Sequence, residues 1–398
     1  MRATSIGHAG ILIETAHGTI VCDPWFVPAF FGSWFVFPRN DRLPEDVQAK
    51  LERPDYLYIS HLHADHLDVA FLREHIQRKA TVLLPAFPTD ELERALRALG
   101  FEHFVHTRHG QPVELRDGLT IRIHIETSIS DGPGGDSALV VDDGDVRLLN
   151  MNDCRIHDLA PLTADRPVDL QWLQYSGAIW YPMVYGYPPE VMRSLVDQKV
   201  EAQLSRAQRY VESVGARVVV PSAGPPCFLD PELFHLNVID GDELAIFPDQ
   251  TVFVERLAAA GIDSARVAIP GTTFEITPTD VAVIHPIPDS EVRAIFDDKR
   301  AYLEHYAADW GPWLAEHKAS WARSATDLVR RLREWWEPLL ALAPTLRQGV
   351  GANVLLRTGG DAVLIDFPRG EVRRHDGEEY AFSFDLPREL VETVVEDR

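Results

Sequence analysis

Apolar and polar positions in the first part of the chain follow the spacings of short buried strands and amphipathic helices. Residues 56–59 and 81–85 are short apolar runs, which is typical of strands buried on both faces. Residues 67–79 and 89–99, on either side of the second run, repeat apolar side chains with a helical period. This alternation predicts a layered α/β fold.

The pattern changes in the C-terminal part of the chain. Residues 290–342 are strongly helical in pattern, and we expect Pro338 to kink or end the last helix. One apolar stripe recurs there in steps of four and three at Trp321, Ala325, Leu328, Leu332, Trp335, Leu339 and Leu342. Residues 351–384 have the pattern of a short antiparallel sheet. We therefore expect a first domain at residues 1–255 and a C-terminal α+β appendage at residues 256–398, with helices at about 290–342 and a small sheet at about 351–384.

Two stretches are unusually aromatic. One lies within residues 26–50 and contains Trp34, and the other lies within residues 168–190 and contains Tyr175, Trp180 and Tyr181. These four residues are candidates for lining a substrate pocket, because aromatic side chains supply large apolar surfaces in binding sites. The alternative is that both stretches are loops packed on the core.

A dense polar cluster at residues 60–66 follows the apolar run 56–59 directly. Side chains alternate along a strand, so His61 and His63 project to the same side, and the loop that follows can bring Asp65 and His66 back toward them. Two imidazoles on one face suit one metal ion, and a carboxylate with a third imidazole suits a second. The alternative is a polar turn whose histidines are incidental.

This His-x-His-x-Asp-His pattern resembles the signature of the metallo-β-lactamase superfamily. Residues 7–14 and 18–25 resemble the family's opening pair of strands, and residues 142–153 resemble the strand that delivers its bridging aspartate, here Asp153. The resemblance covers about residues 1–250. It implies an αββα sandwich that holds two metal ions, with Asp65 and Asp153 as catalytic residues.

The chain departs from the hydrolytic members of this superfamily at one ligand position. The loop that usually contains a histidine corresponds to residues 130–137, which have none. We expect Glu126 to take that place, with His124, Asp131 and Asp136 as alternatives; Glu126 and His124 could equally face solvent. A glutamate would favour iron or manganese over zinc, because harder oxygen ligands suit those ions.

The last ligand of the superfamily is a histidine that follows a late strand. Residues 217–221 resemble that strand, and the next histidine along the chain is His235. We assign His235 to the site. The alternative is an exposed helical histidine, with Asp249 or a water molecule completing the coordination.

The segments at residues 172–182 and 221–228 narrow the resemblance within the superfamily. They look most similar to the branch that contains CMP-N-acetylneuraminate hydroxylase and UDP-N-acetylmuramate hydroxylase, which also have a Rieske iron–sulfur domain. The printed sequence has no paired Cys-x-His and Cys-x-x-His pattern of that kind. An oxygenase of this type would need electrons from a separate ferredoxin-type partner or from the substrate.

Composition limits the classes of partner. The formal net charge of −23 at pH 7 opposes nucleic-acid binding, and no apolar run reaches the roughly 20 residues that cross a bilayer. The three cysteines are far apart and form no Cys-x-x-Cys pair. We expect a cytoplasmic protein that acts on a small molecule, with no nucleic-acid or membrane partner; the oligomeric state is open.

Two enzymatic functions fit these observations, and we favour the first. It is a di-iron, O₂-dependent oxygenase or hydroxylase that acts on a small polar metabolite or natural-product intermediate. The second is a zinc-dependent metallohydrolase of the lactonase or amidase type, in which a hydroxide bridging the metals attacks a carbonyl. A binding module without catalysis is the third alternative.

Overall fold

The computed structural model describes residues 1–127, 134–177, 179–241, 243–322 and 327–396. The chain forms two compact units, Met1–Gly311 and Pro312–Arg398. In the part of the chain that the structure describes, no helix is both long and apolar enough to cross a membrane.

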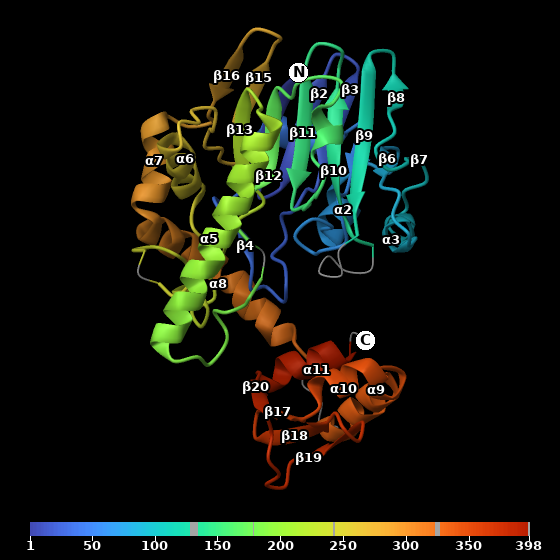
Figure 1. The fold of residues 1–398 in the computed structure, drawn as a ribbon, viewed down its shortest axis with the longest axis vertical. Coiled ribbons are helices and arrows are strands. Elements are labelled where there is room, and N and C mark those ends of the chain that lie inside the picture. Colours follow the sequence, from blue (N-terminus) through green and yellow to red (C-terminus); the bar gives the residue numbers. More distant parts are fainter. Residues whose placement is uncertain (128–133, 178, 242, 323–326, 397–398) are drawn as a thin grey trace. The chain divides into compact units, whose positions relative to one another are not determined.

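Two large sheets form the centre of the first unit (Figure 1). The eight-stranded sheet has the order β16-β15-β1-β2-β3-β5-β6-β7, and the six-stranded sheet has the order β13-β12-β11-β10-β9-β8. The first sheet consists of β1 (Arg2–Gly7), β2 (Gly10–Thr15), β3 (Gly18–Cys22), β5 (Tyr56–Tyr58), β6 (Thr81–Leu84), β7 (Phe104–His106), β15 (Thr273–Ile276) and β16 (Val281–Ile284). The second consists of β8 (Val113–Arg116), β9 (Leu119–Glu126), β10 (Asp136–Asp142), β11 (Arg147–Asn152), β12 (Leu170–Gln174) and β13 (Val218–Ser222).

Helices and a small ribbon complete the first unit. The helices are α1 (Glu45–Leu51), α2 (Val69–His75), α3 (Glu91–Ala98), α4 (Ala160–Thr163), α5 (Pro189–Val214), the 3₁₀ helix η2 (Phe234–Leu236), α6 (Gln250–Ala259), α7 (Asp289–Asp297) and the first part of α8 (Lys299–Ser320). The short strands β4 (Phe35–Val36) and β14 (Pro226–Cys227) pair with each other.

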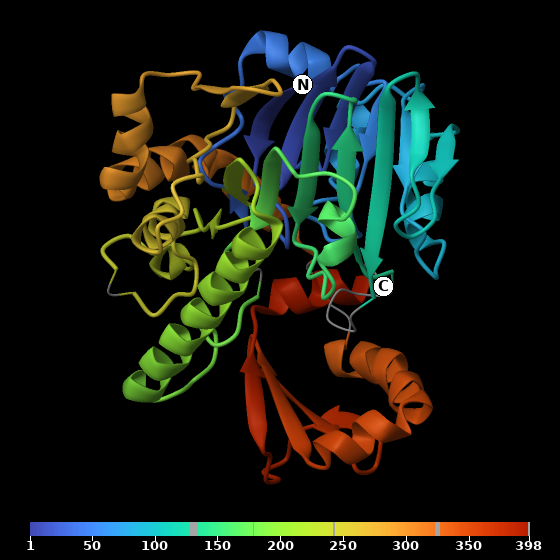
Figure 2. The same cartoon turned by 45° about the horizontal axis from the view of Figure 1, so that its top comes forward.

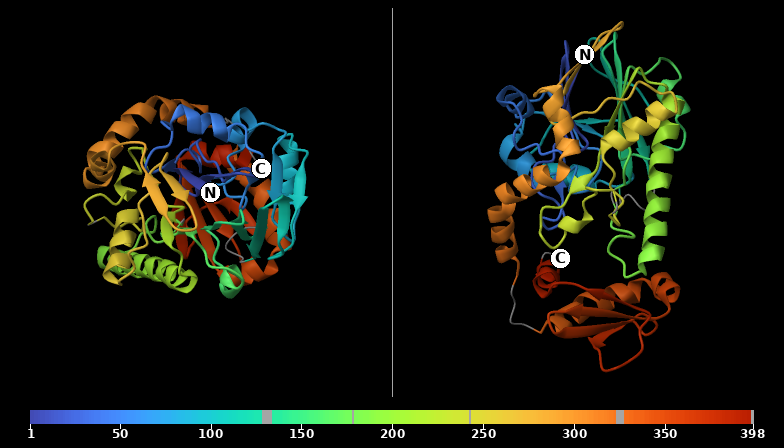
Figure 3. Two further views of the ribbon diagram at one scale, coloured as in Figure 1. Left: turned by 90° about the horizontal axis from the view of Figure 1, so that it is seen from above. Right: turned by 90° about the vertical axis from the view of Figure 1, so that its left-hand side faces the viewer.

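Three apolar layers hold this unit together. Between the two sheets, Ile13 and Leu83 of the first sheet share one buried cluster with Leu139 and Leu148 of the second. Outside the second sheet, Leu204 and Val211 of α5 pack with Val140 and Leu149. Outside the first sheet, α1, α2 and α3 contribute Leu51, Leu72 and Leu96. The helix–sheet–sheet–helix sandwich expected from the sequence is therefore confirmed (Figures 2 and 3).

The first unit is longer than the sequence suggests, because the chain returns to the first sheet after residue 256. Strand β15 pairs antiparallel with β1. The ring of Phe37 contacts those of Phe296 in α7 and Tyr302 in α8. The structure therefore divides the chain after Gly311, and not after residue 255 as the sequence pattern suggests.

The order and direction of the strands bring several strand ends to one edge. Strands β3 and β5 are parallel, and β1, β2 and β3 alternate in direction, so the ends of β1, β3 and β5 share that edge of the first sheet. In the second sheet β10 and β11 are antiparallel, so the start of β10 lies beside the end of β11. Polar residues that follow these strand ends can therefore meet.

The second unit contains a four-stranded sheet of order β19-β18-β17-β20. Its elements are the end of α8, α9 (Leu328–Leu342), α10 (Pro344–Val350), β17 (Asn353–Thr358), β18 (Asp361–Asp366), β19 (Glu371–Arg374), β20 (Phe382–Asp385) and α11 (Arg388–Glu396). Leu328 and Leu332 of the apolar stripe are buried, whereas Leu339 and Leu342 are exposed. Helix α9 continues through Pro338 to Leu342. Ala325 lies outside the described residues.

Candidate metal centre

The residues of the histidine motif follow β5 and form a tight turn. The backbone N–H groups of His66 and Leu67 both donate to the carbonyl oxygen of His63, at 3.0 and 2.8 Å. This turn returns His66 to His61, and the centres of the two rings lie 4.1 Å apart. The geometry therefore brings the motif histidines together, as their spacing predicts.

Asp68 fixes the far end of this turn. Its Oδ1 accepts a hydrogen bond from the backbone N–H of Phe71 and so caps α2. Its Oδ2 accepts hydrogen bonds from the backbone N–H groups of Phe26 and Val27, at 2.9 and 2.8 Å. One carboxylate thus ties the motif turn to the aromatic stretch that begins at Phe26.

Asp23, which follows β3, fixes the start of the turn. Its Oδ1 accepts the backbone N–H of Ser60 at 2.7 Å, and its Oδ2 accepts the Ser60 hydroxyl at 2.8 Å. The same Oδ2 lies 3.0 Å from Nδ1 of His66. The Ser60 hydroxyl oxygen lies 3.0 Å from Nδ1 of His61 and 3.2 Å from Nδ1 of His66.

Asp136, the first residue of β10, contacts the outer side of His61. Its Oδ1 lies 3.2 Å from Nδ1 of His61. Carboxylates in this position orient metal-binding imidazoles, because they fix which ring nitrogen carries the proton. Asp23 and Asp136 therefore support His66 and His61 from outside the cluster.

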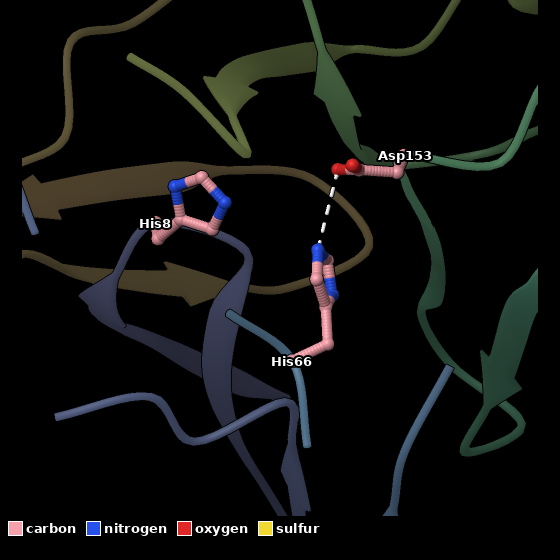
Figure 4. Close-up of side chains that lie close together, drawn as sticks. All are labelled: His8, His66 and Asp153. Atoms are coloured by element: carbon pink, nitrogen blue, oxygen red, sulfur yellow. Dashed lines mark ion pairs between the residues drawn. The ribbon is translucent and has the colours of Figure 1, made fainter. Parts of the chain in front are cut away.

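Two pairs of inner atoms of the cluster lie close together, one within the motif turn and one across the sandwich. Nε2 of His61 lies 2.8 Å from Nδ1 of His63, and Nε2 of His66 lies 3.5 Å from Oδ1 of Asp153 (Figure 4). Asp153 comes directly after β11, so it reaches the motif from the second sheet. Two pairs of potential ligand atoms are thus turned toward each other.

His8, in the turn between β1 and β2, completes the group. Its Nε2 lies 3.2 Å from Oδ2 of Asp65. One ligand atom from each of His8, His66 and Asp153 lies within 4.8 Å of the other two. Figure 4 shows these three side chains around one space.

Opposite charges inside the cluster shift the pKa values of neighbouring side chains. Burial disfavours a charge on His66, yet the carboxylates of Asp153 and Asp23 raise the pKa of this imidazole well above its usual value. Burial also opposes ionisation of Asp65, but the hydrogen bond with His8 and the charge of His66 hold the pKa of Asp65 well below its usual range. The carboxylates therefore attract positive charge into this buried space.

These residues fit bound metal ions. Nε2 of His66 and Oδ1 of Asp153 are buried and have no hydrogen-bond partner in the described part of the chain. Nδ1 of His8 is also buried and has no hydrogen-bond partner among the described residues. Buried polar atoms without partners are costly, and a cation coordinated by imidazole and carboxylate removes that cost. His61, His63, Asp65, His66, Asp153 and His8 are the groups that could hold it.

The strand ends that supply this site have unusual backbone conformations. His8, Asp23, Asn152 and Ala223 all have positive φ angles, of 51°, 42°, 39° and 48°. Such conformations cost non-glycine residues about 1–3 kcal/mol each and persist where the surrounding structure holds them. The backbone N–H of Ala223 donates to the carbonyl oxygen of His8. The fold therefore fixes the turn that presents His8.

The proposed substitute ligand Glu126 lies at the end of β9. It is half-buried, and its Oε1 accepts the backbone N–H of Thr127 at 3.2 Å. Of the alternatives, Asp136 contacts His61, whereas His124 is buried beside His109, and burial together with His109 and Arg122 lowers the pKa of His124 to about 4. Asp131 lies outside the described residues. Glu126 as a metal ligand stays a prediction.

His235 also stays a prediction as a ligand. It is exposed in η2. The alternative, Asp249, precedes α6 and forms an ion pair with Lys299 at 2.6 Å. The contacts of His8 make it a nearer candidate for the last imidazole. The sequence signal for it is a histidine between Gly7 and Gly10, at the start of the first strand of the opening pair.

The four aromatic candidates lie in three different groups. Trp34 and Trp180 contact each other, with ring centres 5.8 Å apart, in a cluster that also contains Trp25. The ring of Trp25 lies 4.9 Å from that of His8, so this cluster borders the site. Tyr175 is fully buried and stacks on Phe253. Tyr181 lies in a separate group with Tyr185 and Tyr187.

Comparison with known proteins identifies the family. A family model described as "Beta-lactamase superfamily domain" matches residues 19–221, half of the chain. A Mycobacterium tuberculosis protein named "Putative Rieske 2Fe-2S iron-sulfur protein Rv3818" is 45% identical over 405 residues, and the match covers 100% of this chain and 78% of that protein. The chain belongs to the β-lactamase superfamily. The predicted membership is confirmed, and metal ions are implied by the fold.

The chain is also similar to other known proteins. Mouse cytidine monophosphate-N-acetylneuraminic acid hydroxylase is 23% identical over 236 residues, which are 56% of this chain and 39% of that enzyme. A metallo hydrolase from Ignicoccus hospitalis has a similar structure, with 20% identity and a TM-score of 0.48, over 69% of this chain and 99% of that one. A second family model, "Rv3818-like, SCP2-like domain", matches residues 328–398.

Proposed function

We propose that this β-lactamase superfamily protein is a di-iron, O₂-dependent oxygenase that hydroxylates a small polar metabolite or natural-product intermediate. The proposal is carried by one observation: proteins named for a Rieske iron–sulfur centre match the whole chain at 45% identity. An iron–sulfur centre transfers single electrons, which an oxygenase consumes and a hydrolase does not require. The distant similarity to cytidine monophosphate-N-acetylneuraminic acid hydroxylase also supports the oxygenase proposal.

Bound iron would supply the redox chemistry that reduces dioxygen. The chain's own residues then have three tasks. His61, His63, Asp65, His66, Asp153 and His8 bind the ions, and Asp23 and Asp136 orient the imidazoles of His66 and His61. Trp25 and the aromatic cluster behind it exclude water from the side of His8.

Electrons would come from a separate centre. The 398 residues contain three cysteines, all buried and free, and none is part of a Cys-x-His pair. A ferredoxin-type or Rieske-type donor is therefore the proposed partner, and a small molecule is the proposed substrate.

A zinc-dependent hydrolase of the lactonase or amidase type is the second candidate. One observation favours it: the six residues gathered at the site are four imidazoles, including His8, and two carboxylates, whereas the sequence suggests four imidazoles and three carboxylates. Imidazole suits zinc as well as iron. In this case Asp65, whose position His8 fixes, would orient the attacking water.

Metal analysis with optical and Mössbauer spectra, on protein expressed with both iron and zinc available, tests the proposal. About two irons per chain, with the spectrum of a coupled iron pair and O₂ consumption upon addition of a reduced ferredoxin, are expected. Two zincs and hydrolysis of a lactone or amide panel would replace the oxygenase with the hydrolase. An Asp153→Asn variant is the control, because it should lose both metal and activity in either case.

A further inference from the structure

The small sheet of the second unit ends in an open edge strand. Strand β20 is the last in the order β19-β18-β17-β20, and among the described residues it pairs with β17 alone (Figure 1). The backbone N–H and C=O groups on its outer side are therefore available to another strand. An edge of this kind is a template for pairing with a second chain.

Large apolar side chains are concentrated along this edge. Phe382 and Phe384 alternate along β20, so they share one face of the sheet, and their ring centres lie 5.6 Å apart. Tyr380 and Leu386 flank the strand, and all four side chains are 41% to 49% exposed. We call these four residues the β20 stripe. Exposed apolar groups on an edge strand favour association, and natural proteins usually protect such edges.

The β20 stripe continues the core of the second unit. Phe382 and Phe384 lie opposite Val354 and Leu356 of β17, and both of these β17 residues are buried in the apolar cluster of the unit. Helix α9 packs against β19, at the other edge of the sheet. The apolar face therefore extends beyond the strand that α9 covers, and the rings at its end stay exposed.

The order of residues in the β20 stripe is self-complementary. When two β20 strands pair antiparallel about a two-fold axis at Ser383, Phe382 of each copy lies opposite Phe384 of the other. In the same register Tyr380 lies opposite Leu386. Every apolar residue of the stripe then meets another apolar residue, and aromatic pairs across strands stabilise a sheet.

Charge and contact area fit a weak association of two copies. On the opposite face of β20, the guanidinium of Arg357 donates two hydrogen bonds to the carboxylate of Asp385, at 2.6 and 2.9 Å, so the charge at this edge is balanced. Large side chains of this type bury about 150–250 Å² each, so covering two half-exposed stripes removes about 500–900 Å². This area is below that of permanent interfaces, which indicates a reversible dimer.

We propose that two copies of this chain form a dimer by antiparallel pairing of their β20 strands, which joins the two four-stranded sheets into one continuous sheet. The surface contains no residue of the metal centre, so the dimer does not depend on the proposed function.

Sedimentation velocity of the full chain over a range of concentrations tests the dimer. Phe382→Lys and Phe384→Glu should each weaken dimerisation at least about tenfold, because each buries a charge against a ring of the other copy. The double variant places the introduced ammonium group opposite the introduced carboxylate of the other copy, so it should recover most of the loss. Leu342→Lys is the matched control, because Leu342 is 83% exposed on α9 of the same unit, and it should change dimerisation less than about twofold.

A cysteine cross-link tests the position of the two-fold axis. Opposite Cα atoms in an antiparallel pair lie about 4.5–5.5 Å apart, which is within the range of a disulfide. Ser383→Cys should therefore give a covalent dimer upon mild oxidation, because the chain's own cysteines are buried. Asp385→Cys, two residues along the same face, should give little, because its thiols would lie far apart in this register.

Salt dependence gives a further check. The formal net charge of −23 opposes association, so higher ionic strength should strengthen the wild-type dimer.

Several outcomes would overturn the proposal. A chain that stays monomeric at every concentration and ionic strength would exclude the dimer. Dissociation by Leu342→Lys would place the interface on α9. A double variant as weak as the single ones, or equal cross-linking of the two cysteine variants, would exclude this register. Melting temperature and metal content, expected to be unchanged in Phe382→Lys and Phe384→Glu, separate a failure of the interface from misfolding and from a failure of the proposed oxygenase.

Discussion

The two sides of the metal cluster are built in different ways. On one side, His61, His63 and His66 come from a single turn of the chain after β5, and backbone hydrogen bonds to His63 form that turn. On the other side, His8 and Asp153 come from the ends of strands in two different sheets. The first side depends on local structure. On the second side, His8 depends on strand pairing within the first sheet, and Asp153 depends on the packing of the second sheet against the first. Metal affinity should therefore depend on the correct packing of the two sheets against each other.

The largest loss of metal affinity is expected when the ligand that comes from the second sheet, Asp153, is changed. Asp153→Asn removes the charge that faces His66, so metal affinity should fall by more than about 100-fold, beyond the range typical of residues outside the ligand set. Metal analysis after dialysis measures this. Asp145→Asn, an exposed residue at the opposite end of β11, should retain its metal; equal losses in both variants would contradict the assignment of Asp153.

A smaller loss of metal affinity should show whether His8 or His235 is the last imidazole ligand. His8→Ala removes one imidazole of the buried group and should weaken metal binding by about 100-fold, at the upper end of the range for groups that support a site. His235→Ala changes an exposed side chain and should have no measurable effect. Competition with a fluorescent chelator measures both. Metal loss in His235→Ala alone would restore the assignment made from the sequence.

The carboxylates that contact the histidines from outside the cluster should influence metal affinity less strongly. Asp23→Asn leaves the ligand atoms in place but removes the acceptor for Ser60 and His66, so metal affinity should fall by about tenfold. The same competition assay applies. A loss as large as that of Asp153→Asn would mean that Asp23 itself binds metal.

The smallest effect is expected for Glu126→Gln. This side chain is half-buried and accepts a hydrogen bond from the next residue, so the variant should change metal affinity less than about twofold, since an amide oxygen retains that hydrogen bond. Iron and zinc content of the purified variant measures this. Loss of one ion per chain would establish Glu126 as the ligand that the sequence suggests.

Local features of the fold were predictable because they depend on neighbours in the sequence. The apolar runs correspond to β5 and β6, and the two amphipathic patterns correspond to α2 and α3. The nitrogens of His61 and His63 that face each other lie 2.8 Å apart, as the motif led us to expect, but both residues lie in the turn after β5 and not on a strand. Their role as metal ligands stays a prediction.

Long-range features were not predictable in the same way. The proximity of His8 to Asp65 depends on a turn with positive φ and on the pairing of β1, β2, β3 and β5. The position of the domain boundary depends on the return of β15 to β1 across most of the chain. No periodicity in the sequence records which distant strands become neighbours. The sequence therefore suggests His235, whereas the structure places the imidazole of His8 in the cluster.

Ser60 has a consequence for proton positions. A serine hydroxyl has one hydrogen and two lone pairs. That hydrogen is donated to Asp23, so the oxygen can only accept from Nδ1 of His61 and Nδ1 of His66. Both imidazoles must then carry their hydrogen on Nδ1 and leave the lone pair of Nε2 free toward the interior. A single hydroxyl that touches no metal thus favours the same tautomer of two histidines as the carboxylates of Asp23 and Asp136 do.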